Sequence, residues 1–275
     1  MPRIAAIGDN VVDCYRSRGE MYPGGNCLNV SVFARRAGAE AAYIGAVGKD
    51  RAGEVIAAAL AAEGVDMSRL RRLDGPTAYC FIGHRDGDRV FESFDLGVSM
   101  FAPSAEDIAF LRRFDAVHVG QSSGLDDFIP EIAGASRLSY DFSTRRDGAH
   151  RRSIGPLCFL ASLSGSDLED GEIEAIAFEL RRAGAQWVLV TRGRNGAQLL
   201  GRNDVFAVPA TPVLPIDTLG AGDAFIARTL VGLLESERPQ RLLAAAADVA
   251  AETCRYFGAV GHGAPLVLPS SEMSA

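Results

Sequence analysis

The sequence has little of what marks a secreted, zinc-binding or membrane-bound protein. Its five cysteines are scattered and odd in number, and no two are spaced as Cys-x-x-Cys. This pattern does not indicate a disulfide framework or a zinc site, so we expect a reducing, cytoplasmic setting. No apolar run reaches membrane-spanning length, and the apolar stretch at residues 4–8 is too short for the core of a signal peptide.

Blocks of positive charge are also missing. Asp and Glu number 35 against 28 Lys and Arg, which gives a net charge of −7, and the arginine pairs are dispersed. We therefore predict no nucleic-acid partner and no membrane surface. The four histidines show no ligand spacing, and His118, inside an apolar run, is interpreted as a buried residue with satisfied hydrogen bonds.

Short apolar runs alternate with Ala- and Leu-rich stretches, and 48% of the residues are hydrophobic. Strands are predicted at residues 4–8, 41–47, 115–120, 138–142, 158–161 and 187–191, and helices at residues 26–37, 53–63 and 104–114. Such alternation predicts a parallel sheet covered by helices on both faces. Because no long linker interrupts it, we predict a single α/β domain over residues 1–275.

One region breaks this rhythm. Residues 77–84 and 89–94 are strand-like and are joined by residues 85–88 (RDGD), whose Asp-Gly step is typical of a hairpin. Residues 11–15 are also β-prone. We predict a small antiparallel lid, formed by about residues 11–22 and 77–96, that stands off the α/β body.

Residues 217–223 (DTLGAGD) lie before a helical stretch. Gly220, Ala221 and Gly222 let backbone N–H groups converge without obstruction, and the positive end of the helix dipole adds to an anion site that suits phosphate. Asp223, in the first turn, would then take a proton from an attacking hydroxyl. The alternative is a plain helix cap, but the length of the run and its place before a helix favour the site.

This run resembles the C-terminal signature of the ribokinase-like (PfkB) carbohydrate kinases. Three more segments match that family in order: residues 7–13 (IGDNVVD), 23–29 (PGGNCLN) and 191–197 (TRGRNGA). The resemblance implies a three-layer α/β/α sandwich with a small β lid, ATP as phosphoryl donor and Mg2+. It also implies a homodimer formed through the lids, which exposed apolar residues such as Phe81, Val90 and Phe91 would favour.

The resemblance also assigns roles. Asp223 is the general base, Gly220, Ala221 and Gly222 form the anion hole, and the nucleotide is bound by Thr191, Gly193, Gly196, Gly220 and Gly222. The sugar is bound by Asp13, Gly25, Asn26 and Asn29. Asp9 would pair with a cationic amine of the substrate, and Arg89 would reach a substrate carboxylate or close over the site. The alternatives are surface turns, helix caps and solvated charges at these positions.

Within the family, the chain looks most like the fructoselysine 6-kinase (fructosamine kinase) branch. The matching residues are 7–13, 24–29, 88–91, 140–143 and 161–162. This implies phosphorylation of the 6-hydroxyl of a fructosamine such as fructoselysine. The alternatives are a kinase of fructose, of 2-keto-3-deoxygluconate or of a nucleoside, and a catalytically weak sugar-binding or regulatory protein of the same fold.

The chain departs from the family where many relatives carry Asn-x-x-Glu, a motif that helps organise Mg2+. Residues 162–165 (SLSG) stand there and lack both the amide and the carboxylate. Asp167 or Glu169 would substitute, or the nucleotide phosphates would hold the ion. The sequence therefore leaves the metal ligands unknown.

Overall fold

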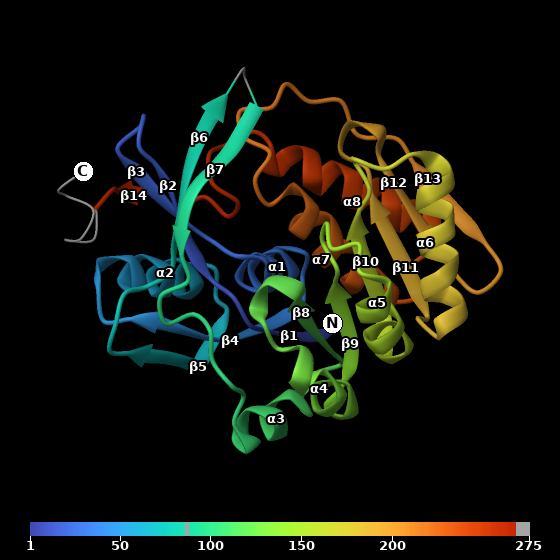
Figure 1. Cartoon of the computed structure of the whole chain (residues 1–275), viewed down its shortest axis with the longest axis horizontal. Helices are drawn as coiled ribbons and strands as arrows, with labels where there is room; N and C mark the ends of the chain where they lie inside the picture. Colours follow the sequence, from blue (N-terminus) through green and yellow to red (C-terminus); the bar gives the residue numbers. More distant parts are fainter. Residues whose placement is uncertain (86–87, 268–275) are drawn as a thin grey trace.

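The computed structural model describes residues 1–85 and 88–267, with no side chains described for residues 84–91. Its main body is a nine-stranded sheet in the order β13-β12-β11-β10-β9-β8-β1-β4-β5 (Figure 1). The strands run parallel from β11 to β5, and β12 and β13 are antiparallel additions. Their bounds are β1 Arg3–Ile7, β4 Glu40–Gly48, β5 Asp66–Leu73, β8 Ala116–Gly120, β9 Arg137–Asp141, β10 Cys158–Ser164, β11 Trp187–Thr191, β12 Ala197–Leu200 and β13 Val205–Val208.

Helices cover both faces of this sheet and bury a separate core on each. In β1, Ile4 and Ala6 point into one core while Ala5 and Ile7 point into the other, as alternation along a strand requires. The first core includes α1 Asn26–Arg36, α2 Arg51–Ala62, α7 Ala221–Leu234 and α8 Pro239–Thr253. The second includes α3 Ala105–Leu111, α4 Ile129–Ala135, α5 Gly148–Ile154 and α6 Asp170–Ala183. The predicted three-layer sandwich is confirmed.

Sequence patterns did not predict β5, β12 or β13. Strand β5 carries the charged sequence DMSRLRRL and is an edge strand, so much of its surface needs no apolar cover. Its Arg69 and Arg71 both pair with the buried carboxylate of Asp107 on α3, Arg69 at 2.6 Å. Ion pairs therefore stabilise this edge strand, and a search for apolar runs does not detect it.

A second sheet, of five strands, has the order β14-β3-β2-β6-β7 and stands off the main body (Figure 1). Its bounds are β2 Val11–Tyr15, β3 Glu20–Gly24, β6 Tyr79–Arg85, β7 Asp88–Asp95 and β14 Ala264–Pro265. Strands thus form in both stretches assigned to a lid, although β2 pairs with β6 in parallel. The predicted turn at Asp86 and Gly87 lies outside the described residues, and closure of this sheet over a substrate stays a prediction.

One side chain of this second sheet was predicted wrongly. Phe81 was expected to be exposed, but its side chain is fully buried, with the guanidinium of Arg16 stacked 3.9 Å from the ring centroid. The face of β6 that carries Phe81 packs inward, because alternate residues of a strand point to opposite faces. None of the helices in the described part of the chain has the length and hydropathy to cross a bilayer.

Candidate active site

The candidate site lies where the parallel strands end and two helices begin. Parallel strands bring their carboxyl ends to one edge of a sheet, and here β9 ends at Asp141. Helices α1 and α7 pack against each other (Figure 1), and they begin at Asn26 and Ala221. This arrangement brings together Asp141, Asn26 and Asp223, which are far apart in the sequence.

Asp223 is held by two amides from α1. Asn26 Nδ2 donates to Asp223 Oδ1 at 2.8 Å, and Asn29 Nδ2 donates to Asp223 Oδ2 at 2.7 Å. Part of the residue stays accessible, as contact with a substrate requires, but loss of hydration raises the pKa of the carboxyl to about 7. The charges of Asp141 and Asp9 push the pKa in the same direction, while the two amide donors oppose it. A carboxylate with this pKa is suited to accept a proton near neutral pH.

These shifts predict the acid limb of the pH–rate profile. Below about pH 7, Asp223 binds a proton and can no longer accept one, so kcat/KM is expected to fall, with a limiting slope of about tenfold per pH unit. Burial also raises the pKa of Asp141, to about 6, so the two carboxyls titrate as a coupled pair and the limb is broad. Initial rates across the pH range, at several substrate concentrations, measure it.

The control for this profile is the free energy of unfolding. Both folded pKa values lie above the ordinary value of 3.8, so the folded state binds more protons than the unfolded chain between about pH 4 and pH 7. These two groups therefore reduce stability as the pH rises through that window. Urea titrations should find no loss of stability between pH 8 and pH 6 that parallels the loss of rate. A parallel loss would assign the limb to unfolding instead.

Asn26 also contacts a second carboxylate and a histidine. Its Nδ2 donates to Asp141 Oδ2 at 3.0 Å, and its Oδ1 lies 2.9 Å from His118 Nε2. Asp141 accepts further hydrogen bonds at Oδ1, from the Ser143 N–H and the Ser162 hydroxyl. The polar atoms of Asn26 are thus engaged by protein groups, and its predicted contact with the sugar stays a prediction.

Asp9 has a structural role that the sequence did not reveal. Its Oδ2 accepts from the backbone N–H of Asn26 at 2.9 Å, and its Oδ1 accepts from Cys27 N–H at 3.3 Å and from the Ser123 hydroxyl at 2.9 Å. A carboxylate there satisfies the unpaired N–H groups of α1 and complements its dipole. Asp9 therefore caps α1 from outside the helix; its predicted contact with a substrate amine stays untested.

The other predicted sugar contacts surround the start of α1. Asp13 is buried in β2, and a Cβ at Gly24 would lie 2.1 Å from Asp13 Oδ2, so Gly24 makes room for this carboxylate. Gly25 is the N-cap with φ 103°, and a Cβ there would lie 2.6 Å from Asn10 Cα. Arg89 belongs to β7, but its side chain lies outside the described part of the chain.

The predicted anion hole forms the N-terminus of α7. Gly220 is the N-cap in the left-handed conformation, φ 76°, and a Cβ there would lie 2.5 Å from Ala259 Cβ. Gly220 has no side chain to cap the first-turn N–H groups of α7. At Gly222, by contrast, an added Cβ would meet nothing within 4 Å. The helix start therefore faces open space on the side of Gly222 and is packed on the side of Gly220.

The loop before α7 is fixed in place by hydrogen bonds to Asp217. Asp217 accepts from the N–H groups of Leu219 and Gly258, each at 3.0 Å, and from the hydroxyl of Tyr15 in β2. The first residue of the DTLGAGD run thus joins the loop to the second sheet and to the segment at residues 256–262. Strand β13, which precedes this run in the chain, ends at Val208.

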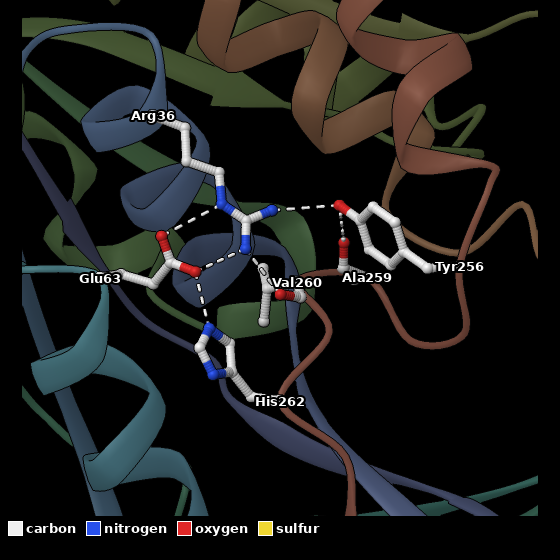
Figure 2. Close-up of polar contacts among 6 residues, drawn as sticks. All are labelled: Arg36, Glu63, Tyr256, Ala259, Val260 and His262. Atoms are coloured by element: carbon white, nitrogen blue, oxygen red, sulfur yellow. Dashed lines mark hydrogen bonds and ion pairs between the residues drawn. The ribbon is translucent and has the colours of Figure 1, made fainter.

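The segment at residues 256–262 is tied to α1 and α2 by a polar cluster (Figure 2). Arg36, at the end of α1, donates to the Tyr256 hydroxyl at 3.0 Å and to the Val260 carbonyl at 2.7 Å. Its guanidinium also pairs with Glu63, the C-cap of α2, and His262 Nε2 lies 2.6 Å from Glu63 Oε1. Ala259, which packs against Gly220, lies inside this segment. The cluster therefore supports the N-terminus of α7, the predicted anion hole, on the side of Gly220.

The predicted nucleotide loop lies at the same edge of the sheet. Thr191 ends β11, which pairs with β10, and β10 pairs with β9. Gly193 begins a short 3-10 helix, Gly193–Asn195, and has φ 54°. Gly196 has φ 83°, and a Cβ there would lie 1.9 Å from the Val208 carbonyl oxygen, so only glycine fits. Gly196 thus has a structural requirement of its own, and nucleotide binding by this loop stays a prediction.

The segment that replaces Asn-x-x-Glu does not build a metal cage. Ser162, in β10, donates to Asp141 instead. Asp167 pairs with Arg146 at 2.6 Å, and Glu169 caps α6 in a reciprocal capping box with Glu172. Within residues 1–85 and 88–267, no three His, Cys, Asp or Glu side chains are placed to share a metal ion. The two carboxylates suggested as substitutes are therefore engaged elsewhere.

Two members of the site were given no role from the sequence. Asp141 was noted only as part of the resemblance, and His118 only as a buried residue. His118 pairs with Ser139 across β8 and β9, so two polar residues face one another inside a fully buried part of the sheet. Polar residues at matching depths of neighbouring apolar strands are the signal that would have indicated a buried hydrogen-bond network.

Comparison with known proteins decides the family. The model of the pfkB family of carbohydrate kinases matches residues 4–134 and 160–265. The chain belongs to this family. The fold agrees with that of a putative ribokinase II from E. coli, which was solved in complex with ATP and Mg2+. The two structures superpose with a TM-score of 0.81 at 23% identity, and the match covers 94% of this chain and 95% of the ribokinase chain. The protein is therefore an ATP-dependent carbohydrate kinase, and the predicted family and activity are confirmed.

Two pfkB relatives resemble the chain over nearly their whole length. Fructosamine kinase FrlD of Bacillus subtilis is 37% identical over 268 residues, which are 96% of this chain and 94% of the relative. Fructoselysine 6-kinase of Escherichia coli is 34% identical over 261 residues, which are 94% of this chain and 100% of the relative. The branch predicted from the sequence motifs is thus the branch of these relatives.

Proposed function

We propose that this pfkB kinase phosphorylates the 6-hydroxyl of a fructosamine such as fructoselysine, with ATP as the donor. The names and full-length similarity of the relatives at 37% and 34% identity support the substrate class. The observation that carries the chemistry is Asp223, held by Asn26 and Asn29 at the open start of α7. A fructokinase of Klebsiella pneumoniae at 32% identity keeps plain fructose as the second candidate.

In the proposed reaction, the oxygen of the sugar hydroxyl attacks the γ-phosphorus of ATP. The new O–P bond forms as the bond from the γ-phosphorus to the bridging oxygen breaks, and ADP leaves. Asp223 takes the hydroxyl proton, and the N–H groups at the start of α7 stabilise charge on the transferring phosphoryl oxygens. The amides of Asn26 and Asn29 keep the base oriented throughout.

We propose that Mg2+ enters with the nucleotide. The described side chains form no cage for the ion, and Mg2+ is commonly held by substrate phosphates with few protein ligands. This fits an ion carried by ATP, which would neutralise phosphate charge when bound. The residues proposed to contact ATP are Thr191, Gly193, Gly196, Gly220 and Gly222.

Assembly and location form a further part of the proposal. Exposed apolar side chains on and after β7, namely Phe94 at 68%, Leu96 at 48% and Met100 at 41%, support a homodimer through the second sheet. All five cysteines are buried, which suits their use as small apolar residues in the cytoplasm. Sedimentation of the purified protein would report the assembly.

The proposed substrate is tested by a panel. ATP consumption is measured with fructoselysine, fructose, 2-keto-3-deoxygluconate and adenosine. We expect kcat/KM for fructoselysine to exceed that for fructose by at least about 100-fold. Only fructoselysine carries the amine-bearing half, and binding energy from that half would lower the barrier to its reaction. Phosphorus NMR of the product locates the new ester. Turnover of a plain sugar alone would reject the fructosamine, and failure on the whole panel would revive the weak sugar-binding protein.

A further inference from the structure

The orientation of the Asn26 amide is enforced from both ends. Its NH2 group serves two carboxylates, at 2.8 Å to Asp223 and 3.0 Å to Asp141. Its Oδ1 sits in a slot above Gly120, where a Cβ would lie only 2.2 Å away, and faces His118. An amide turned the other way would place its oxygen against the two carboxylates.

The hydrogen-bond partners define the tautomer of His118. Because Asn26 Oδ1 can only accept, His118 Nε2 must carry the ring hydrogen. Burial lowers the pKa of His118 to about 3, so the ring is neutral and has no second hydrogen. Nδ1 is therefore an acceptor, and the Ser139 hydroxyl, 2.9 Å away, is its donor. A directed series runs from Ser139 through His118 and Asn26 to the two carboxylates.

We propose that His118 is a positioning residue of this kinase: by donating to Asn26 Oδ1, it holds the amide in the one orientation that serves Asp141 and Asp223 together. The inference rests on the proposed role of Asp223 as the base. His118 and Ser139 are both fully buried within the sheet, so neither touches the substrate. Their effect on the reaction passes through Asn26 alone.

The positioning has a consequence for the base. The charged groups that act most strongly on Asp223 are Asp141 from β9 and Asp9 from the loop after β1, and both favour its protonated form. The amide donors of Asn26 and Asn29 are the groups that favour its ionised form. If Asn26 is released from its slot, Asp223 loses one of these donors. A higher pH is then needed to ionise it.

The experiment compares pH profiles of kcat/KM for the full-length protein. His118→Phe keeps a ring but has no donor, and we expect its acid limb to move up by about half to one pH unit. Its rate should fall by about three- to eightfold near pH 6.5 and far less near pH 9. His118→Gln restores an N–H that can reach Asn26 Oδ1, so its limb should lie close to that of the wild type. A purely structural role for His118 would lower the rate equally at all pH values.

Ser139→Ala keeps the proposal testable if His118→Phe does not fold. It removes the donor to Nδ1 and weakens the preference for the Nε2–H tautomer, so its limb should shift in the same direction by less. Ser31→Ala is the matched control, because Ser31 is an equally buried serine on α1 and, among the described residues, its hydroxyl bonds only the Leu28 carbonyl. An unmoved limb in His118→Phe, or Ser139→Ala indistinguishable from Ser31→Ala, would overturn the proposal.

Asp223→Asn separates this inference from the function on which it rests. If Asp223→Asn is inactive while the acid limb of His118→Phe does not move, only the positioning role of His118 is rejected. If Asp223→Asn keeps full activity, the base assignment itself fails.

Discussion

Replacing Asp223 by asparagine is expected to lower kcat by about three orders of magnitude, within the range that general-base catalysis contributes. The amide has nearly the shape of the carboxylate but cannot take the proton of the sugar hydroxyl at neutral pH. Because the proposed base acts on the sugar hydroxyl and not on the nucleotide, the affinity for ATP should stay close to that of the wild type. Product formation and calorimetric titration with ATP measure the two quantities separately.

The free energy of unfolding, unlike the rate, should not fall in the Asp223→Asn variant. The pKa of about 7 means that the folded state disfavours the Asp223 charge, next to Asp141 and Asp9. A neutral amide removes that repulsion, so the variant should resist urea at least as well as the wild type near pH 8. Asp115→Asn is the control, since Asp115 pairs with Arg3 at the opposite edge of the sheet. A rate within about tenfold of the wild type for Asp223→Asn would exclude Asp223 as the base.

Gly222→Ala is expected to make the protein more stable and much less active. An added Cβ meets no atom within 4 Å, and alanine in a helix is favoured over glycine by about 0.5–1 kcal/mol. The open space beside Gly222 is, however, where we place the phosphoryl oxygens. A methyl group there keeps them from the N–H groups, and we expect kcat to fall about 100-fold, as for loss of one anion-hole donor.

The chain offers a closely matched control for this change. Gly171 is the second residue of α6, as Gly222 is of α7, and a Cβ at Gly171 also meets nothing within 4 Å. Gly171→Ala should give a similar gain in the free energy of unfolding without a change in kcat. If Gly222→Ala were as active as Gly171→Ala, phosphate would not approach α7 at this point, and the proposed anion hole would have to be abandoned.

Local patterns were sufficient where the backbone itself imposes a residue type. Gly25 and Gly220 have φ of 103° and 76°, which glycine adopts far more readily than other residues, and both precede helices that the sequence predicted. The alternation of apolar runs likewise predicted most strands of the large sheet. Edge strand β5 was missed because its charged side chains pair with Asp107, and burial of Phe81 was missed because its facing depends on how the second sheet packs.

The sequence by itself determined the layered fold, the glycine-rich start of α7 and the identity of Asp223 as its carboxylate, because these depend on spacing within a few residues. The tertiary structure alone decided what surrounds that carboxylate. Asn26 and Asn29 precede Asp223 by 197 and 194 residues, and no local spacing connects them. The tertiary structure also places Asp9 at the start of α1 and His118 within hydrogen-bond distance of Asn26. The pKa of the base follows from this packing, because loss of hydration and neighbouring charge depend on distance in space.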